Sequence, residues 1–220
     1  MISFIIAMEK EAAPLLNNMT DVSQKIANGK KVFIGNLFGH EISVVICGVG
    51  KVNAACGAQY AIDCLNADKI VNLGVAGGLD KSMNVADVYA IEKAVQYDFD
   101  LTQLNGTAMG TLDEFDENYL SVSSKSVYPL KRLATGDRFN DSKDDFNLLT
   151  KELKADIRDM EGAAIAQTCV HAGVSFKSYK IISDIAGSGS TAEQYFKNLG
   201  KCFAKLEAEL ENIMNEVARG

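Results

Sequence analysis

The sequence predicts an α/β fold with a mixed sheet, because apolar strand-like runs alternate with segments of helical periodicity. Residues 51–66 have apolar side chains at helical spacing between an apolar run at 41–47 and another at 69–73, which makes a strand, helix, strand unit. Residues 31–38 and 41–47 are apolar and β-branched runs separated by residues 39–40, the pattern of a hairpin. The hairpin predicts that part of the sheet is antiparallel or mixed.

Each remaining element is predicted from its own pattern. The apolar run at 2–7 predicts a first buried strand, and 9–19 predicts a helix that tolerates Pro14 only near its first turn. The apolar residues of 195–217 recur at three- and four-residue spacing, which predicts a last helix with one face on the core. The polar stretch 97–118 is expected to be a long loop, and such loops are usually functional or disordered. Further strands are expected at 87–95, 130–135, near 158 and at 176–183, and further helices at 143–153 and 161–172.

Composition and charge predict a single domain over residues 1–220 that works in the cytoplasm. A chain of this length can bury a sizeable core without disulfides, and its five cysteines are odd in number and lack the close spacing of zinc or redox motifs. We interpret them as buried thiols in a reducing compartment. The net charge of −7 comes from interspersed acidic and basic residues, so no basic stripe predicts a nucleic-acid partner. The apolar run near the start is too short to span a bilayer, so no membrane partner is expected.

Three carboxylates follow apolar strand-like runs, namely Glu11, Glu161 and Asp184. In open α/β sheets ligands bind at the carboxyl ends of strands, so these side chains can converge on one cleft. Each also has a structural explanation, because Glu11 and Glu161 would lie in first turns of helices and Asp184 could cap a turn. The occurrence of all three carboxylates at strand ends favours a ligand-binding site. His40 and His171 have neither the spacing of a metal pair nor a recognisable nucleophile motif beside them, so no metal is expected.

Two glycine-rich segments follow strands. Gly48 and Gly50 begin a helix as a dinucleotide-binding fingerprint would, but Asn53 stands where that motif needs its last small residue. The two glycines therefore serve either close backbone packing or a backbone that faces a ligand, and the sequence favours neither. The GVAGG segment at 74–78 is interpreted as a turn whose backbone angles let a ligand approach its N–H groups.

Seven segments occur in the order and spacing of the nucleoside phosphorylase and nucleosidase superfamily, which the chain resembles over nearly its whole length: AMEKEAAPL, GVGKVNAA, NLGVAGGL, YDFDLTQ, ATGDRF, DMEGAAIA and IISDIA. Within that superfamily the pattern is most similar to the 5'-methylthioadenosine/S-adenosylhomocysteine nucleosidases. The resemblance implies a three-layer α/β/α fold around a mixed, partly barrel-like sheet. It also implies hydrolysis of the N-glycosidic bond of 5'-thio-substituted adenosines, with a small purine nucleoside as the partner and no cofactor.

The resemblance also implies roles for single residues. Asp184 would supply a proton toward purine N7, Glu161 would bind the ribose hydroxyls and Glu11 would activate water. Met160 and Phe139 also match family positions, and for these two side chains ordinary core packing is the alternative to a role in substrate binding. The other matching positions would contact the substrate: Met8 and Val49 as an apolar wall at the 5' end, Ala76 and Gly77 beside base and sugar, Phe139 stacked on the base, Met160 under the ribose and Ser183 beside the proton donor.

Hydrolysis is favoured over phosphorolysis by the residues expected near the nucleophile. Related phosphorylases carry an arginine two residues before the first glycine of the GVAGG-like segment, and this chain has Asn72 there. Glu11 would also repel a phosphate ion. A purine nucleoside phosphorylase and a non-catalytic nucleoside-binding module are the two alternatives.

The family pattern also predicts the assembly and the cover of the site. The resemblance implies a homodimer in which the loop at 97–118 reaches the partner's site. Around the 5' group the chain departs from the pattern, because Arg138 and Asn140 are more polar than usual. Tyr195 or Phe196 is the candidate cover for that group.

Overall fold

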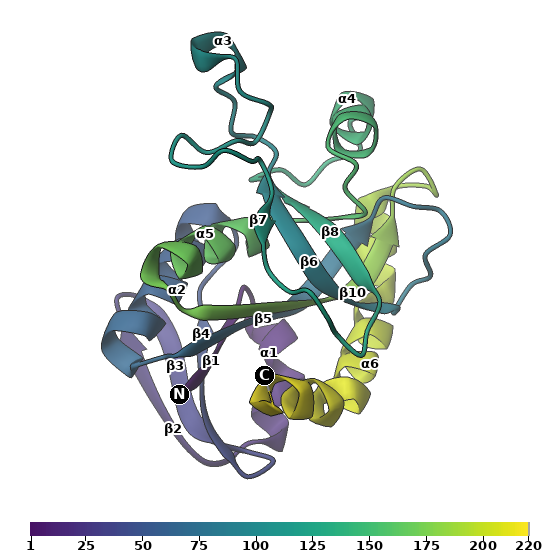
Figure 1. Cartoon of the computed structure of the whole chain (residues 1–220). Coiled ribbons are helices and arrows are strands. Elements are labelled where there is room, and N and C mark those ends of the chain that lie inside the picture. Colours follow the sequence, from purple (N-terminus) through teal and green to yellow (C-terminus); the bar gives the residue numbers. More distant parts are fainter. Residues whose placement is uncertain (220) are drawn as a thin grey trace.

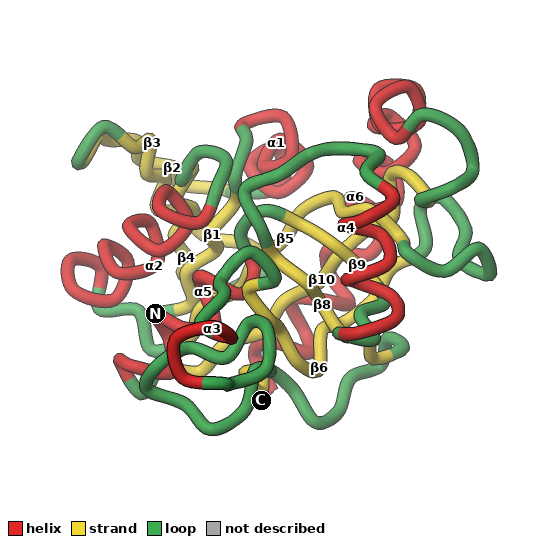
Figure 2. The backbone as a smooth tube through the Cα atoms, turned by 90° about the horizontal axis from the view of Figure 1, so that it is seen from above, coloured by secondary structure: helices red, strands yellow, loops and turns green. Residues whose placement is uncertain are grey.

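The computed structural model describes residues 1–219 and has the predicted α/β architecture, with helices around a central sheet (Figure 1; Figure 2). Its strands are β1 (Ile2–Ile6), β2 (Thr20–Ala27), β3 (Lys30–Leu37), β4 (His40–Ile46), β5 (Lys69–Gly78), β6 (Val88–Gln96), β7 (Leu120–Ser121), β8 (Leu130–Thr135), β9 (Ile157–Asp159) and β10 (Ser175–Ile185). Its helices are α1 (Glu9–Asn18), α2 (Lys51–Leu65), α3 (Thr102–Asn105), α4 (Lys143–Asn147), α5 (Gly162–Ala172) and α6 (Thr191–Arg219), with a π-helical turn at Leu148–Glu152. No helix within residues 1–219 is both long and apolar enough to cross a membrane.

Five strands close into a small barrel, which confirms the mixed, partly barrel-like sheet. Strand β5 pairs in parallel with β10 and antiparallel with β9, and β10 pairs antiparallel with β6. Strands β6 and β9 both pair in parallel with β8, so the ring is β5, β10, β6, β8 and β9. From β5 the sheet continues outward through β1, β4, β3 and β2, with the predicted hairpin as β3 and β4.

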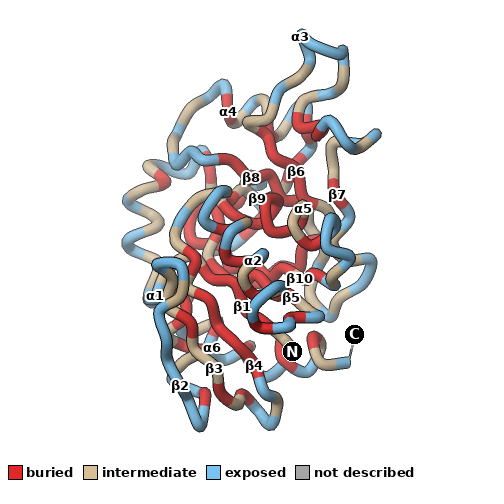
Figure 3. Tube along the Cα trace, turned by 90° about the vertical axis from the view of Figure 1, so that its left-hand side faces the viewer, coloured by how far each residue is buried: buried red, intermediate tan, exposed pale blue. Residues whose placement is uncertain are grey.

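Helices cover both faces of the extended sheet, which gives the predicted three layers. In β1, Ile5 packs with Ala58 of α2 and Ile165 of α5, whereas its neighbour Phe4 packs with Leu15 of α1 and with α6. Successive side chains of a strand point to opposite faces, so this alternation places one helix pair on each side. Buried residues run through the centre along β1, β5 and β10, while β2 and α3 lie at the exposed periphery (Figure 3).

The structure differs from the prediction at β2 and at the hairpin turn. Strand β2 was not predicted, because its residues are exposed almost throughout, and pairing with β3 at the sheet edge is what orders it. The turn consists of Phe38 and Gly39, with φ of 48° and 83°, and His40 already belongs to β4. Two consecutive positive φ angles are typical of a type I′ turn, whose twist matches that of the flanking strands.

Strands β5 and β10 run further than predicted, and both extensions carry site residues. The GVAGG segment is the end of β5 rather than a turn, and none of its glycines has a positive φ. The glycines are explained instead by the close approach of carboxylate side chains to the β5 backbone. A Cβ on Gly74 would lie 3.2 Å from Glu11 Oε1, and a Cβ on Gly77 would lie 2.9 Å from Asp184 Oδ2. Asp184 itself lies within β10, just after a register shift that begins at Ile182.

Three smaller expectations also change. The helix predicted at 143–153 is the short α4 followed by the π-helical turn, and the loop at 97–118 contains the short α3. The interpretation of every cysteine as buried is wrong for Cys56 and Cys64, which are exposed on α2. Helix α2 packs through small residues on its other face, so these two thiols meet solvent. The other three cysteines are buried: Cys47, Cys169 and Cys202.

Candidate active site

A cavity of about 370 Å³ opens at the ends of β1, β5, β9 and β10, the edge predicted for the three carboxylates. Every residue nominated from the sequence lines it: Met8, Glu11, Val49, Ala76, Gly77, Phe139, Met160, Glu161, Ser183 and Asp184. The wall also contains Arg138, Tyr195 and Phe196, and five residues that the sequence analysis did not nominate: Ala7, Val75, Arg158, Asp159 and Ala192. The fold therefore brings the nominated residues together, while their chemical roles stay predictions.

Glu11 reaches the cavity from the first turn of α1, directly after β1. Its side chain is buried, Oε2 accepts a hydrogen bond from Met8 N (3.2 Å), and Oε1 accepts one from Val75 N of β5 (3.1 Å). Burial raises the pKa of Glu11 above its ordinary value, and these backbone donors oppose the rise only in part. A carboxylate with a raised pKa is a stronger base than an exposed one, which suits it to accept a proton from water.

A buried ammonium group accompanies the carboxylates. Lys180, in the middle of β10, is 1% exposed, and its Nζ lies 2.7 Å from Asp159 Oδ2. Burial acts to lower the pKa of Lys180, but the neighbouring carboxylates, led by Asp159, outweigh burial and leave the pKa raised. The lysine therefore stays charged and offsets part of the negative charge that Glu11, Asp159 and Glu161 bring into one region.

Glu161 is the N-cap residue of α5 rather than part of its first turn. Its Oε1 accepts a hydrogen bond from Gly50 N (2.9 Å), and Gly50 has a φ of 100° that favours glycine. Burial, followed by the charge of Asp159, raises the pKa of Glu161 to about 7. The Gly48–Gly50 segment thus binds a carboxylate through its backbone, and Val49 between the two glycines lines the cavity.

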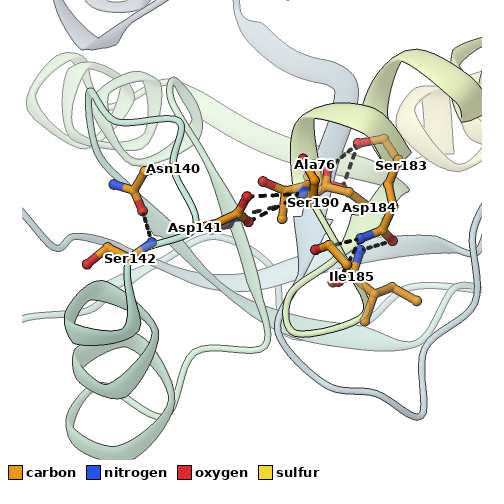
Figure 4. A network of polar contacts seen from close by, with 12 residues as sticks. Ala76, Asn140, Asp141, Ser142, Ser183, Asp184, Ile185 and Ser190 are labelled. Carbon is orange, nitrogen blue, oxygen red and sulfur yellow. Dashed lines mark hydrogen bonds and ion pairs between the residues drawn. The ribbon is translucent and has the colours of Figure 1, made fainter.

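Asp184 presents one satisfied and one unsatisfied oxygen. Ser183 Oγ donates to Asp184 Oδ1 at 2.7 Å and lies 3.3 Å from Ala76 O, so Ser183 joins β10 to β5 beside the acid (Figure 4). Asp184 Oδ2 has no hydrogen-bond partner within residues 1–219 and lies 3.9 Å from Arg158 Nη2. Burial raises the pKa of Asp184, and the Ser183 hydrogen bond and the Arg158 charge oppose that rise without cancelling it. The group is therefore suited to hold and donate a proton.

Aromatic side chains form the outer part of the cavity. The Phe139 and Tyr195 rings meet edge to face with centroids 5.7 Å apart, and Tyr195 Oη lies 3.9 Å from Met8 Sδ. The loop after β8 that carries Phe139 is tied to the start of α6, because Asp141 accepts a hydrogen bond from Thr191 N at 3.3 Å (Figure 4). Tyr195, the predicted cover, thus lies beside both a base-stacking candidate and a 5'-end candidate.

The sequence analysis missed Lys180, Asp159 and Arg158. The available signal for Lys180 was a lysine in the middle of the predicted strand FKSYKIIS, directly before Ile181 and Ile182, where a buried lysine would need a countercharge. Asp159 and Arg158 adjoin Met160 in a strand too short to show a pattern. Among residues 1–219 no three His, Cys, Asp or Glu side chains are grouped so that they could hold a metal ion.

Comparison with known proteins agrees with this geometry. The sequence profile of the phosphorylase superfamily matches residues 2–219. The chain is 31% identical to the 5'-methylthioadenosine/S-adenosylhomocysteine nucleosidase of Hydrogenovibrio crunogenus, over 95% of this chain and 97% of that protein. It is 33% identical to the enzyme of that name from Geobacillus kaustophilus, over 97% of each.

Solved structures show the same fold. The chain superposes with a TM-score of 0.88 on the Helicobacter pylori 5'-methylthioadenosine/S-adenosylhomocysteine nucleosidase in complex with a substituted pyrrolidin-3-ol, at 26% identity over 98% of this chain and 97% of that one. The Colwellia psychrerythraea nucleosidase in complex with adenine gives 0.89, at 28% identity over 98% and 95%. Futalosine hydrolase from Helicobacter pylori gives 0.90, at 25% identity over 98% and 97%. By sequence and by fold, the chain belongs to the phosphorylase superfamily, within its group of 5'-methylthioadenosine/S-adenosylhomocysteine nucleosidases.

Proposed function

We propose that this protein hydrolyses the N-glycosidic bond of 5'-thio-substituted adenosines such as 5'-methylthioadenosine and S-adenosylhomocysteine, releasing adenine and a 5-thio-ribose. The observation that carries the proposal is the convergence of three buried carboxylates, Glu11, Glu161 and Asp184, on one cavity. The names of two relatives at 31% and 33% identity, both 5'-methylthioadenosine/S-adenosylhomocysteine nucleosidases, support the choice of substrate.

In the proposed reaction the base departs with the electron pair of the glycosidic bond and leaves an oxocarbenium-like ribosyl group. A proton on N7 makes the base a better leaving group, and Asp184 donates it from a neutral carboxyl. The raised pKa that burial produces at Asp184 supports this role. The unsatisfied Oδ2 is the atom available for the transfer.

Glu11 and Glu161 act on the sugar side. Glu11 takes a proton from the water that attacks C1', and Glu161 accepts hydrogen bonds from the ribose hydroxyls. Two carboxylates beside the ring also favour the positive charge that develops there. The backbone N–H of Gly50 holds Glu161 in place, and the charge of Lys180, which contacts the neighbouring Asp159, offsets part of the negative charge of both carboxylates.

The remaining wall residues suit a nucleoside with an apolar 5' end. Phe139 stacks on the base, Met160 lies under the ribose, and Ala76 and Gly77 border base and sugar. A thioether at the 5' end would meet an apolar wall from Met8, Val49 and the Tyr195 ring, and Tyr195 lies within 3.9 Å of Met8 Sδ.

Water is the proposed nucleophile because Asn72, not an arginine, stands two residues before Gly74, where related phosphorylases carry a cation for phosphate. Asn72 is buried in β5, where its Nδ2 donates to Ile5 O (3.0 Å) and its Oδ1 accepts from Ser178 Oγ (3.2 Å), so it is a neutral packing residue. Glu11 would repel an anion at the position of the nucleophile. Phosphorolysis is the rival reaction.

The decisive experiment is incubation with 5'-methylthioadenosine in phosphate-free buffer, with and without added phosphate. Adenine and free methylthioribose, released at the same rate in both, are expected. Release that requires phosphate and yields a sugar 1-phosphate would identify a phosphorylase. Tight adenosine binding without turnover would instead identify the nucleoside-binding module.

We also propose that the protein is a cytoplasmic homodimer that works in methionine salvage. The family resemblance supports the dimer, and the exposed apolar residues Val52 (74% exposed) and Leu104 (80%) give α2 and the 97–118 loop surfaces suited to a partner. Five free cysteines support a reducing compartment.

A further inference from the structure

Two buried polar atoms in the cavity wall lack a hydrogen-bond partner within residues 1–219: Arg158 Nη2 and Asp184 Oδ2. They lie 3.9 Å apart, too far for a hydrogen bond, although their side chains are only 11% and 2% exposed. Leaving a buried polar group unpaired is destabilising, and more so when the group is charged. The two atoms therefore indicate a ligand that supplies a partner for each.

The absence of a side chain at Gly77 makes room in the cavity wall for both Arg158 and Asp184. Arg158 is its cross-strand neighbour in the β5 and β9 pair. A Cβ on Gly77 would lie 2.9 Å from Asp184 Oδ2 and 3.1 Å from Arg158 Nε, so the guanidinium and the carboxyl share the space that a side chain would fill. The second oxygen of Asp184, Oδ1, is already bound by Ser183 Oγ. Oδ2 and Arg158 Nη2 are thus the two atoms of this pair of side chains that lack a hydrogen-bond partner within residues 1–219.

The chemistry of this pair selects one kind of purine edge. A guanidinium only donates hydrogen bonds, and a protonated Asp184 Oδ2 also donates. A 6-oxopurine presents two adjacent acceptors, N7 and O6, whereas a 6-aminopurine presents the N7 acceptor beside an amino donor. Against a 6-aminopurine, Asp184 still meets N7, but the Arg158 donors gain no partner from the amino group. Against a 6-oxopurine, both unsatisfied atoms gain a partner.

We propose that Arg158 and Asp184 together read the N7 and position-6 edge of the base, and that the protein accepts 5'-thio-substituted 6-oxopurine nucleosides of the inosine type. The inference rests on the proposed function, because it takes Asp184 to face the base. Asp184 donates to N7, and Arg158 donates to O6. The Arg158 charge also stabilises the electron density that the base gains as the bond breaks.

Base binding tests this inference without requiring turnover. Calorimetry should measure hypoxanthine and adenine binding to the wild type, to Arg158→Met, which keeps an apolar stem without donors, and to Arg132→Met as a control outside the cavity. A hydrogen bond from a charged donor is worth about 1.5–3 kcal/mol, so Arg158→Met should lose about 10- to 100-fold in hypoxanthine affinity. Adenine affinity should change less than about threefold. Equal loss for both bases, or no loss for hypoxanthine, overturns the inference.

Turnover separates the inference from the proposed function. The ratio of kcat/KM for 5'-methylthioinosine to that for 5'-methylthioadenosine should fall at least about tenfold in Arg158→Met. If the wild type cleaves neither nucleoside, the proposed function fails and the two base affinities still decide the inference. If Arg158→Met does not fold, the wild type decides alone. Hypoxanthine affinity within about tenfold of adenine affinity supports the inference, and a weaker affinity overturns it.

Discussion

At the residue scale, Glu11, Glu161 and Asp184 have different surroundings, and these surroundings suit them to different tasks. Glu11 is held by two backbone N–H groups, Glu161 by the N–H of Gly50, and Asp184 by a single serine hydroxyl. Burial raises the pKa of all three. Of the three, Asp184 is the one with a fully buried oxygen that lacks a hydrogen-bond partner in residues 1–219, which suits a proton donor to a bound base.

Replacing the proposed acid tests its role. Asp184→Asn keeps the shape and the Ser183 contact but removes the acidic proton, so we expect substrate binding with kcat lowered about 10²- to 10⁴-fold. Steady-state kinetics with 5'-methylthioadenosine measures the change, and Asp80→Asn, outside the cavity, is the matched control. Near-normal turnover would remove Asp184 from the acid role.

Glu161 predicts a pH-dependent stability. Its pKa is about 7 in the folded protein against an ordinary value of 4.5, so the folded state binds its proton more tightly than the unfolded state. Stability from this group is therefore greatest below about pH 4.5 and is lost as the pH rises toward 7. We expect the Tm of Glu161→Gln minus that of the wild type to become more positive between pH 5 and 8. The exposed control Glu207→Gln should show no such trend, and a flat difference for both would contradict the prediction.

At the element scale, the ends of β5 and β10 are the structural basis of the site. The glycines of β5 leave room for carboxylates from α1 and β10, and after the register shift in β10 Asp184 pairs with Gly77 of β5. Lys180 lies four residues earlier on the same strand and contacts Asp159. Two adjacent strands thus place both the acid and the countercharge.

A methyl group on Gly77 should damage the site more than the fold. Gly77→Ala would push its Cβ against Asp184 Oδ2 and Arg158 Nε, so we expect kcat/KM to fall at least about tenfold, since even 1 Å misplacement is costly. Gly200→Ala in α6 meets nothing within 4 Å and should instead raise stability by about 0.5–1 kcal/mol. Unchanged kinetics in Gly77→Ala would contradict the close-approach explanation.

Lys180 should be essential to stability at neutral pH. Lys180→Met leaves the buried carboxylates without a countercharge, and breaking a buried ion pair costs about 3–5 kcal/mol. The loss should be smaller at pH 5.5 than at pH 8, because Glu11 and Glu161, with their raised pKa values, take up protons. Urea unfolding at both pH values measures the difference. An equal loss at both would show that Lys180 acts through packing alone.

At the scale of the whole molecule, barrel closure brings distant segments into one cavity. The β5–β10 pairing joins residues more than a hundred positions apart, and β9 completes the ring beside them. The loop after β8 and the start of α6 meet through Asp141 and form the outer wall. The long polar loop with α3 extends away from this body (Figure 1), where a second subunit could contact it.

Oligomerisation can be tested through that loop. Light scattering at micromolar concentration should give a dimer for the wild type. Leu104→Asp places a charge on an 80% exposed apolar residue of the loop and should raise the monomer fraction. Val127→Asp, at an equally exposed apolar residue elsewhere, is the control. A wild-type monomer would contradict the proposed homodimer.

The sequence by itself determined the α/β class, the hairpin, most strands and helices and the strand-end carboxylates Glu11, Glu161 and Asp184, because apolar periodicity and strand-end position are local signals. The other seven nominated cavity residues followed from the resemblance to the family. Only the tertiary structure decided the placement of β2, because its exposed residues carry no pattern. It also decided the strand conformation of GVAGG, whose glycines leave room for the Glu11 and Asp184 side chains from other elements. It also decided the roles of Lys180 and Arg158. The role of a charged side chain in a strand depends on the countercharge or the unpaired atom near it, and these groups come within reach only when the barrel closes.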